Sequence, residues 1–129
     1  MVLPDTSVWV QYLREGSSGN AAELGNLLET REAMCCGPVA AELIGGAREP
    51  DRNALWRVLG GLPWARLERR EWRTVGTTAG ALRARGETVP LTDVMIGVAA
   101  AGAGATVWTA DSDFDRLAHV LDGLTVRRL

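Results

Sequence analysis

Short apolar runs that alternate with helical segments constrain the fold of this chain more than any other feature of its sequence. Between the runs, leucine, valine and alanine recur at helical spacing, and glycine or proline marks most of the breaks. This alternation is typical of βαβ units, so it predicts an α/β fold with a mostly parallel central sheet and helices on both faces. The predicted strands are residues 2–3, 33–36, 64–67, 106–109 and a last run within 124–128, and the predicted helices are residues 5–13, 20–32, 39–47, 53–59, 71–85 and 92–105.

Length and composition predict a single domain over residues 1–129 in the cytoplasm. Hydrophobic residues make up 47% of the chain, which is enough for a substantial core. No apolar run reaches the roughly 20 residues that a membrane span needs, and the N-terminus lacks the basic start of a signal peptide. Cys35 and Cys36 are adjacent, so we expect buried, reduced thiols rather than a disulfide or a metal site.

Isolated acidic residues occupy equivalent places in this pattern. Asp5 follows the first strand where the chain turns into a helix, Asp93 opens a helix rich in small residues, and Asp111 and Asp113 follow the strand at 106–109. In α/β folds, ligands bind beyond the carboxyl ends of the strands, where these acids are expected. Glu42 differs, because its apolar neighbours leave little polar stripe on its helix, and we expect it to be buried.

Each acid also has a purely structural interpretation. Asp5 and Asp93 suit the capping of helices, Glu42 could face solvent, and the aspartates of DSDFD could bond their own backbone in a turn. One explanation covers all of them, because clustered carboxylates are costly unless a cation offsets their repulsion. Oxygen ligands favour Mg²⁺ or Mn²⁺. Zinc is disfavoured, since His119 is the single histidine and the cysteines lack ligand spacing.

A site of this kind predicts metal-assisted hydrolysis of a phosphodiester. An acidic pocket repels phosphate until a bound metal ion reverses the local field. The metal can then activate water and neutralise charge on the phosphoryl oxygens. The sequence leaves open whether one ion or two are bound.

Four segments, in this order, resemble the PIN-domain family. They are PDTSVWVQYL at residues 4–13, VAAELIGGA at 39–47, LRARGETVPLTDVMIGVAAA at 82–101 and VWTADSDFDRL at 107–117. Within the family, the chain is most similar to VapC-type toxins of bacterial type II toxin–antitoxin pairs. No single motif is specific, but the resemblance covers nearly the whole chain, and the order and spacing of the four segments carry it.

The resemblance implies a PIN-like fold and a Mg²⁺- or Mn²⁺-dependent ribonuclease. Asp5 and Asp93, with Asp111 or Asp113, would hold the metal, and which of the last two is the nearer ligand stays open. Glu42 would position or deprotonate the attacking water. Hydroxyl positions that support the acids by hydrogen bonds match Thr6, Ser7 and Thr109.

The resemblance also implies partners. They are an RNA substrate, a second copy of the chain in a homodimer, and a small antitoxin whose tail docks near the acids. Five tryptophans are many for this length, and Trp9, Trp56 or Trp64 could anchor a partner. The alternatives are a non-catalytic PIN-like module that acts only through its protein partner and a Mg²⁺ phosphatase. The complete acidic set argues against the module, and the phosphatase motif DxDx[TV] is absent where DTS stands.

Overall fold

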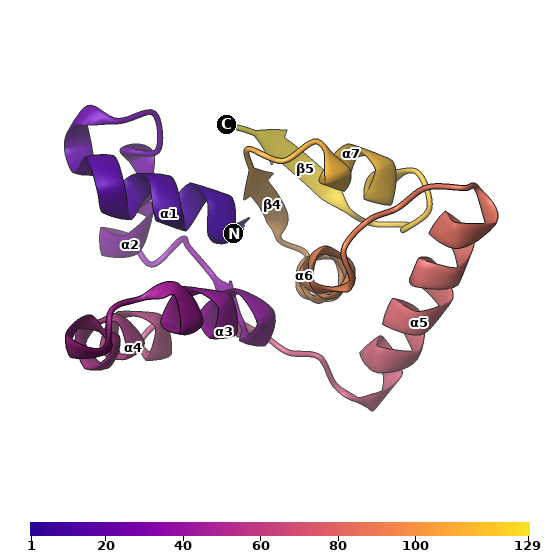
Figure 1. The fold of residues 1–129 in the computed structure, drawn as a ribbon, viewed down its shortest axis with the longest axis horizontal. Helices are drawn as coiled ribbons and strands as arrows, with labels where there is room; N and C mark the ends of the chain where they lie inside the picture. The colour runs from indigo at the N-terminus through magenta and orange to yellow at the C-terminus, as the bar shows by residue number, and fades with distance from the viewer.

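The computed structural model describes residues 1–129, and its elements follow the alternation predicted from the sequence (Figure 1). The strands are β1 Val2–Pro4, β2 Cys35–Cys36, β3 Trp64–Ala65, β4 Thr106–Thr109 and β5 Thr125–Arg128. The α-helices are α1 Thr6–Glu15, α2 Glu23–Glu29, α3 Gly37–Gly46, α4 Arg52–Gly60, α5 Arg69–Ala84, α6 Leu91–Ala103 and α7 Asp113–Ala118. Two short 3₁₀ helices, η1 Gly16–Ser18 and η2 Glu49–Asp51, precede α2 and α4.

All strand pairs are parallel, as predicted, but the sheet is divided into two. One sheet has the order β1-β4-β5, and the other pairs β2 with β3. The run that we predicted as one strand, residues 33–36, serves both sheets. Ala33 bridges to Val2 of β1, whereas the two residues of β2 pair with β3. The sheet divides there because one short segment changes its neighbour within four residues.

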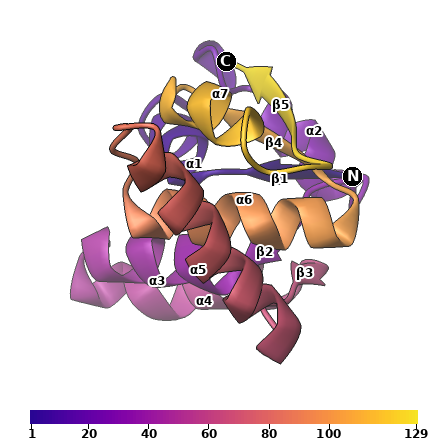
Figure 2. The same ribbon diagram turned by 90° about the vertical axis from the view of Figure 1, so that its right-hand side faces the viewer.

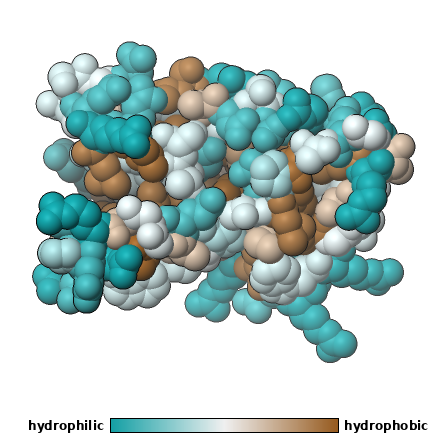
Figure 3. Space-filling model, in the orientation of Figure 1, coloured by the Kyte–Doolittle hydropathy of each residue, from teal (hydrophilic) through white to brown (hydrophobic).

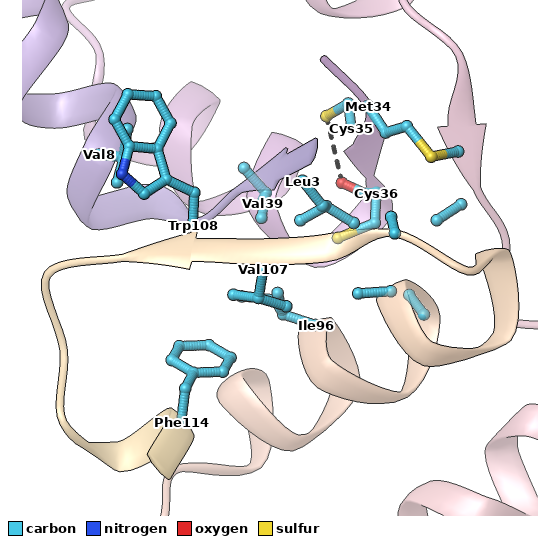
Figure 4. Close-up of a cluster of buried hydrophobic side chains, with 14 of the residues drawn as sticks. Leu3, Val8, Met34, Cys35, Cys36, Val39, Ile96, Val107, Trp108 and Phe114 are labelled. Carbon is cyan, nitrogen blue, oxygen red and sulfur yellow. Dashed lines mark hydrogen bonds between the residues drawn. The ribbon is translucent and has the colours of Figure 1, made fainter. Parts of the chain in front are cut away.

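Helices cover both faces of the larger sheet, which follows from the alternation of side chains along β4. Val107 points toward Ile96 of α6 and Phe114 of α7, whereas Trp108 points toward Val8 of α1 (Figure 4). Figures 1 and 2 show α6 packed beneath the strands, with α5 outside it. The predicted α/β architecture with helices on two faces is therefore confirmed.

Smaller expectations have mixed outcomes. Cys35 and Cys36 are buried free thiols, as predicted, and burial raises their pKa values to about 11 and about 12. The strand at 64–67 is shorter than predicted and ends at Ala65. No helix combines the length and the apolar character that crossing a membrane would require.

Close packing between α6 and α7 brings two acid-bearing helix starts together. A Cβ added to Gly97 would lie 2.4 Å from Cδ2 of Leu117, so the helices meet at a distance that only glycine permits. Asp93 lies four residues before Gly97 on α6, and Asp113 lies four residues before Leu117 on α7. Since four residues are about one helical turn, the tight contact lies one turn along from both aspartates.

Candidate metal site

Three aspartates from two neighbouring segments form an acidic cluster. Carboxylate oxygens of Asp93, Asp111 and Asp113 all lie within 4.8 Å of one another, and all three residues are half-buried. Asp93 lies in the first turn of α6, Asp111 in the turn after β4, and Asp113 at the start of α7. Two of them are thus presented beyond the carboxyl end of a parallel strand, where α/β folds build their sites.

The electrostatics of Asp93 connect this cluster to the other predicted acids. The pKa of Asp93 is raised to about 6, first by burial and then by the negative charges of Asp111, Asp5 and Glu42. A neighbouring like charge disfavours ionisation only when it lies close. The acids of the β1–α1 turn, of α3, of α6 and of the β4–α7 turn therefore share one electrostatic field.

Asp5 is buried at the centre of a hydrogen-bonded network. Its Oδ1 accepts from the Ser7 hydroxyl at 2.5 Å and from the backbone N–H of Val8 at 3.2 Å, so it caps α1. Its Oδ2 accepts from the Thr109 hydroxyl at 2.6 Å. Burial raises the pKa of Asp5, and these hydrogen bonds act against that rise. Asp5 is not part of the three-aspartate cluster, but Oδ2 retains a lone pair.

Two hydroxyl groups link Asp5 to the turn that carries Asp111. The Ser7 oxygen accepts from the N–H of Ala110 at 3.1 Å, and the Thr109 oxygen accepts from the N–H of Asp111 at 2.8 Å. Because both oxygens accept from backbone donors, each hydroxyl proton is free to point at Asp5. The turn is thereby held in register with the first helix.

Glu42 is exposed, so the expectation that it is buried is wrong. The buried stripe of α3 consists of Val39, Ala40 and Leu43, and it leaves Glu42 on the solvent side of the helix. Ala41 is also exposed, which alanine tolerates at little cost. Glu42 nevertheless faces the acidic site, since its Oε1 accepts from the Thr6 hydroxyl at 2.7 Å and its charge raises the pKa of Asp93.

Two arginines beside the cluster were not predicted from the sequence. Arg116 forms an ion pair with Asp113 three residues earlier on α7, a spacing that could have indicated the pair. Arg128 of β5 forms an ion pair with Asp115 at 2.9 Å and donates to the carbonyl oxygen of Ala110 at 3.2 Å. Nothing local in the sequence indicates the second contact, because it depends on which strand lies beside β4.

The donor set fits a hard divalent cation. Three carboxylates lie within coordinating reach of one another, and Asp5 and Glu42 add negative charge around them. Oxygen-only ligand sets suit Mg²⁺ and Mn²⁺, whereas the chain's one histidine, His119, is not in the cluster.

Comparisons with known proteins give a consistent result. A model of the PIN domain matches residues 2–120. The chain is 34% identical over 125 residues to the VapC ribonuclease Mb1587 of Mycobacterium bovis and, equally, to ribonuclease VapC11 of Mycobacterium tuberculosis, with 93% of each chain covered.

Solved structures share the fold along the whole chain. DNA-bound VapBC from Salmonella typhimurium superposes with a TM-score of 0.78 at 21% identity, covering 98% of this chain and 96% of that one. VapBC2 from Rickettsia felis, bound to a DNA fragment from its promoter, gives a TM-score of 0.76 at 16% identity, covering 99% and 98%. At these identities, the likeness bears on the fold alone.

Proposed function

The chain belongs to the PIN-domain family, and from this membership we propose that it is a ribonuclease toxin of the VapC type. It hydrolyses phosphodiester bonds of RNA, and residues 1–129 act as one domain. The observation that carries the proposal is the convergence of Asp93, Asp111 and Asp113, which are otherwise a costly arrangement of like charges.

Mg²⁺ or Mn²⁺ is the cofactor of this activity. Asp93, Asp111 and Asp113 would hold the ion, and Asp5, whose Oδ2 retains a lone pair, would add negative charge beside it. When bound, the ion neutralises charge on the phosphoryl oxygens and lowers the pKa of water. The carboxylate cluster alone would repel the RNA backbone, so substrate binding and metal binding are coupled.

Glu42 is the general base of the reaction. Its Oε1 is oriented by Thr6, while Oε2 accepts no hydrogen bond within the chain and is free to take the proton of the attacking water. Its exposure suits this role, because solvent and substrate must both reach it. The Thr6 hydroxyl fixes the side chain without occupying the reactive oxygen.

The decisive experiment compares cleavage of RNA by the wild type, Asp93→Asn and Asp122→Asn, with Mg²⁺, with Mn²⁺ and after chelation. Asp122 is an exposed acid outside the cluster and serves as the control. The wild type and Asp122→Asn should cleave only with metal, and Asp93→Asn should fall to the level of the chelated protein. Undiminished cleavage by Asp93→Asn would show that the chemistry lies elsewhere.

The protein partner that silences this activity is a small antitoxin. An apolar groove of about 570 Å³ lies between α1, α2 and α4, and Figure 3 shows apolar surface in this region. Trp9, which the sequence suggested as a partner anchor, lines the floor of the groove but is only 1% exposed. An apolar helix of the antitoxin would fill the groove and pack against its exposed leucine and valine side chains, Leu13 and Val58. The groove follows α1, whose first turn carries Thr6 and Ser7 beside the acids.

Co-expression with the small protein encoded beside this chain tests the assignment. Leu13 lines the groove and is 56% exposed, whereas Trp72 on α5 lies outside it and is 49% exposed. Leu13→Asp should keep ribonuclease activity but escape neutralisation, and Trp72→Asp should still be neutralised. Equal neutralisation of both variants would place the antitoxin on another surface.

We also propose a homodimer. Sedimentation of the purified chain at several concentrations tests it, because a dimer dissociates on dilution and an inherently monomeric chain does not change.

A further inference from the structure

Two neighbouring arginines on β5 reach in different directions. Arg127 forms an ion pair with Glu23 of α2, and its guanidinium lies 4.7 Å from the centroid of the Trp108 ring. Arg128 forms an ion pair with Asp115 and also donates to the carbonyl oxygen of Ala110. The two arginine side chains are equally exposed, at 43% and 44%. They differ in that only Arg128 contacts the segment that carries the clustered aspartates.

The contacts of Arg128 span that segment. Ala110 immediately precedes Asp111, and Asp115 follows Asp113 by two residues. One guanidinium therefore joins the backbone on one side of the two acids to a side chain on the other side. Parallel pairing places Arg128 opposite Thr109, and the N–H of Leu129 donates to the Thr109 carbonyl at 2.8 Å, so the end of β5 is fixed beside the turn.

Arg128 adds a restraint to a turn whose acids lie close together. Arg116 offsets part of the charge of Asp113, and the N–H of Asp113 donates to Oδ1 of Asp111 at 2.9 Å, but Asp111 forms no ion pair and still repels the nearby carboxylates. On one side, Ser7 and Thr109 hold the backbone N–H groups of the turn. On the opposite side, Arg128 holds a carbonyl group, and it brings a positive charge to the acidic segment.

Resting on the metal-dependent function proposed above, we propose that Arg128 is a positioning residue of the metal site. It keeps Asp111 and Asp113 at the spacing that coordinates the ion, and it touches neither the ion nor the substrate. Residues outside the ligand set that orient ligands typically change metal affinity about 10–100-fold when they are removed.

A metal titration followed by thermal unfolding tests this role without any assay of activity. Arg128→Gln should need about tenfold more Mn²⁺ than the wild type for half of the maximal stabilisation. Arg127→Gln loses an ion pair of the same kind on the same strand and should shift that concentration less than about twofold, because exposed ion pairs contribute little. Asp115→Asn, which keeps the contact with Ala110, should lie between them.

Rescue by excess metal separates positioning from general destabilisation. The RNA cleavage rate of Arg128→Gln should return to the wild-type rate at saturating Mn²⁺, since a misplaced ligand set still fills by mass action. Equal metal affinities for Arg128→Gln and Arg127→Gln, with a metal response in both, would overturn the role of Arg128 and leave the proposed function intact. A wild type that gains no stability from either metal would overturn the metal site and this role together.

Discussion

The two walls of the acidic site are held in different ways. On one wall, Asp93 and Asp113 lie at the starts of α6 and α7, which pack at the contact of Gly97 with Leu117. On the other wall, Glu42 projects from the exposed side of α3 and is oriented by one hydroxyl group. The first, which we call the packed wall, is held by contacts in the core. The second, the exposed wall, is held by a single hydrogen bond at the surface.

This difference matches two chemical requirements. Metal ligands must be held close together against their mutual repulsion, which a tightly packed pair of helices achieves. A general base needs access to water and a small range of movement, which burial would prevent. Substitutions on the two walls should therefore separate metal binding from catalysis.

The largest expected effect is on catalysis at the exposed wall. Glu42→Gln keeps the acceptor oxygen for Thr6 but cannot take a proton, so the cleavage rate should fall about 10²–10⁴-fold, the range typical of a general base. The concentration of Mn²⁺ that gives half-maximal thermal stabilisation should stay near the wild-type value. A parallel loss of metal affinity would mean that Glu42 is a ligand and that the two walls do not differ in this way.

The next effect is on metal binding at the packed wall. Gly97→Ala places a Cβ 2.4 Å from Cδ2 of Leu117, which is fully buried and has little freedom to move. Overpacking of this kind costs about 1–3 kcal/mol of unfolding free energy, and here it should also separate Asp93 from Asp113 and weaken metal binding.

Gly102→Ala is the control for this change, since it lies on the same helix and its Cβ meets only Cγ of Glu71 at 3.8 Å. Gly102 is the last residue but one of α6, so alanine should stabilise this variant by less than the roughly 0.5–1 kcal/mol that it gives in a helix interior. Titration calorimetry with Mn²⁺ measures both affinities. Unchanged affinity in Gly97→Ala would show that Leu117 relaxes without moving α7.

The sequence predicted the packed wall better than the exposed one. Asp93, Asp111 and Asp113 could be recognised because strand ends and helix starts are local patterns. The burial of Glu42 was wrongly predicted because its alanine neighbours were counted as apolar, although Ala41 faces solvent. Contacts between segments that are distant in the sequence could not be predicted, because no local sequence pattern indicates which elements become neighbours.

Two features of the fold illustrate that limit. Residues 33–36 read as one apolar strand, and nothing within them indicates that Ala33 pairs with Val2 while Cys35 pairs with Trp64. Arg128 contacts Ala110 only because β5 lies beside β4 in one register. Both features follow from the pairing of distant segments, which spacing along the chain does not encode.

The smallest expected effect concerns the stability of the metal-free protein and measures what it costs to ionise Asp93, which is half-buried and surrounded by other acids. The pKa of Asp93 is about 6 in the folded chain and 3.8 in the unfolded reference, so the folded chain binds this proton more tightly. The stabilisation from this group is complete below pH 3.8 and is lost as the pH rises through about 6.

In chelator, the free energy of unfolding of the wild type should therefore fall between pH 5 and pH 7.5. Asp93→Asn cannot ionise and should lose less over the same interval, which urea denaturation at the two pH values measures. An equal loss in both proteins would mean that ionisation of Asp93 does not cost the fold stability, contrary to the burial and the neighbouring charges that raise its pKa.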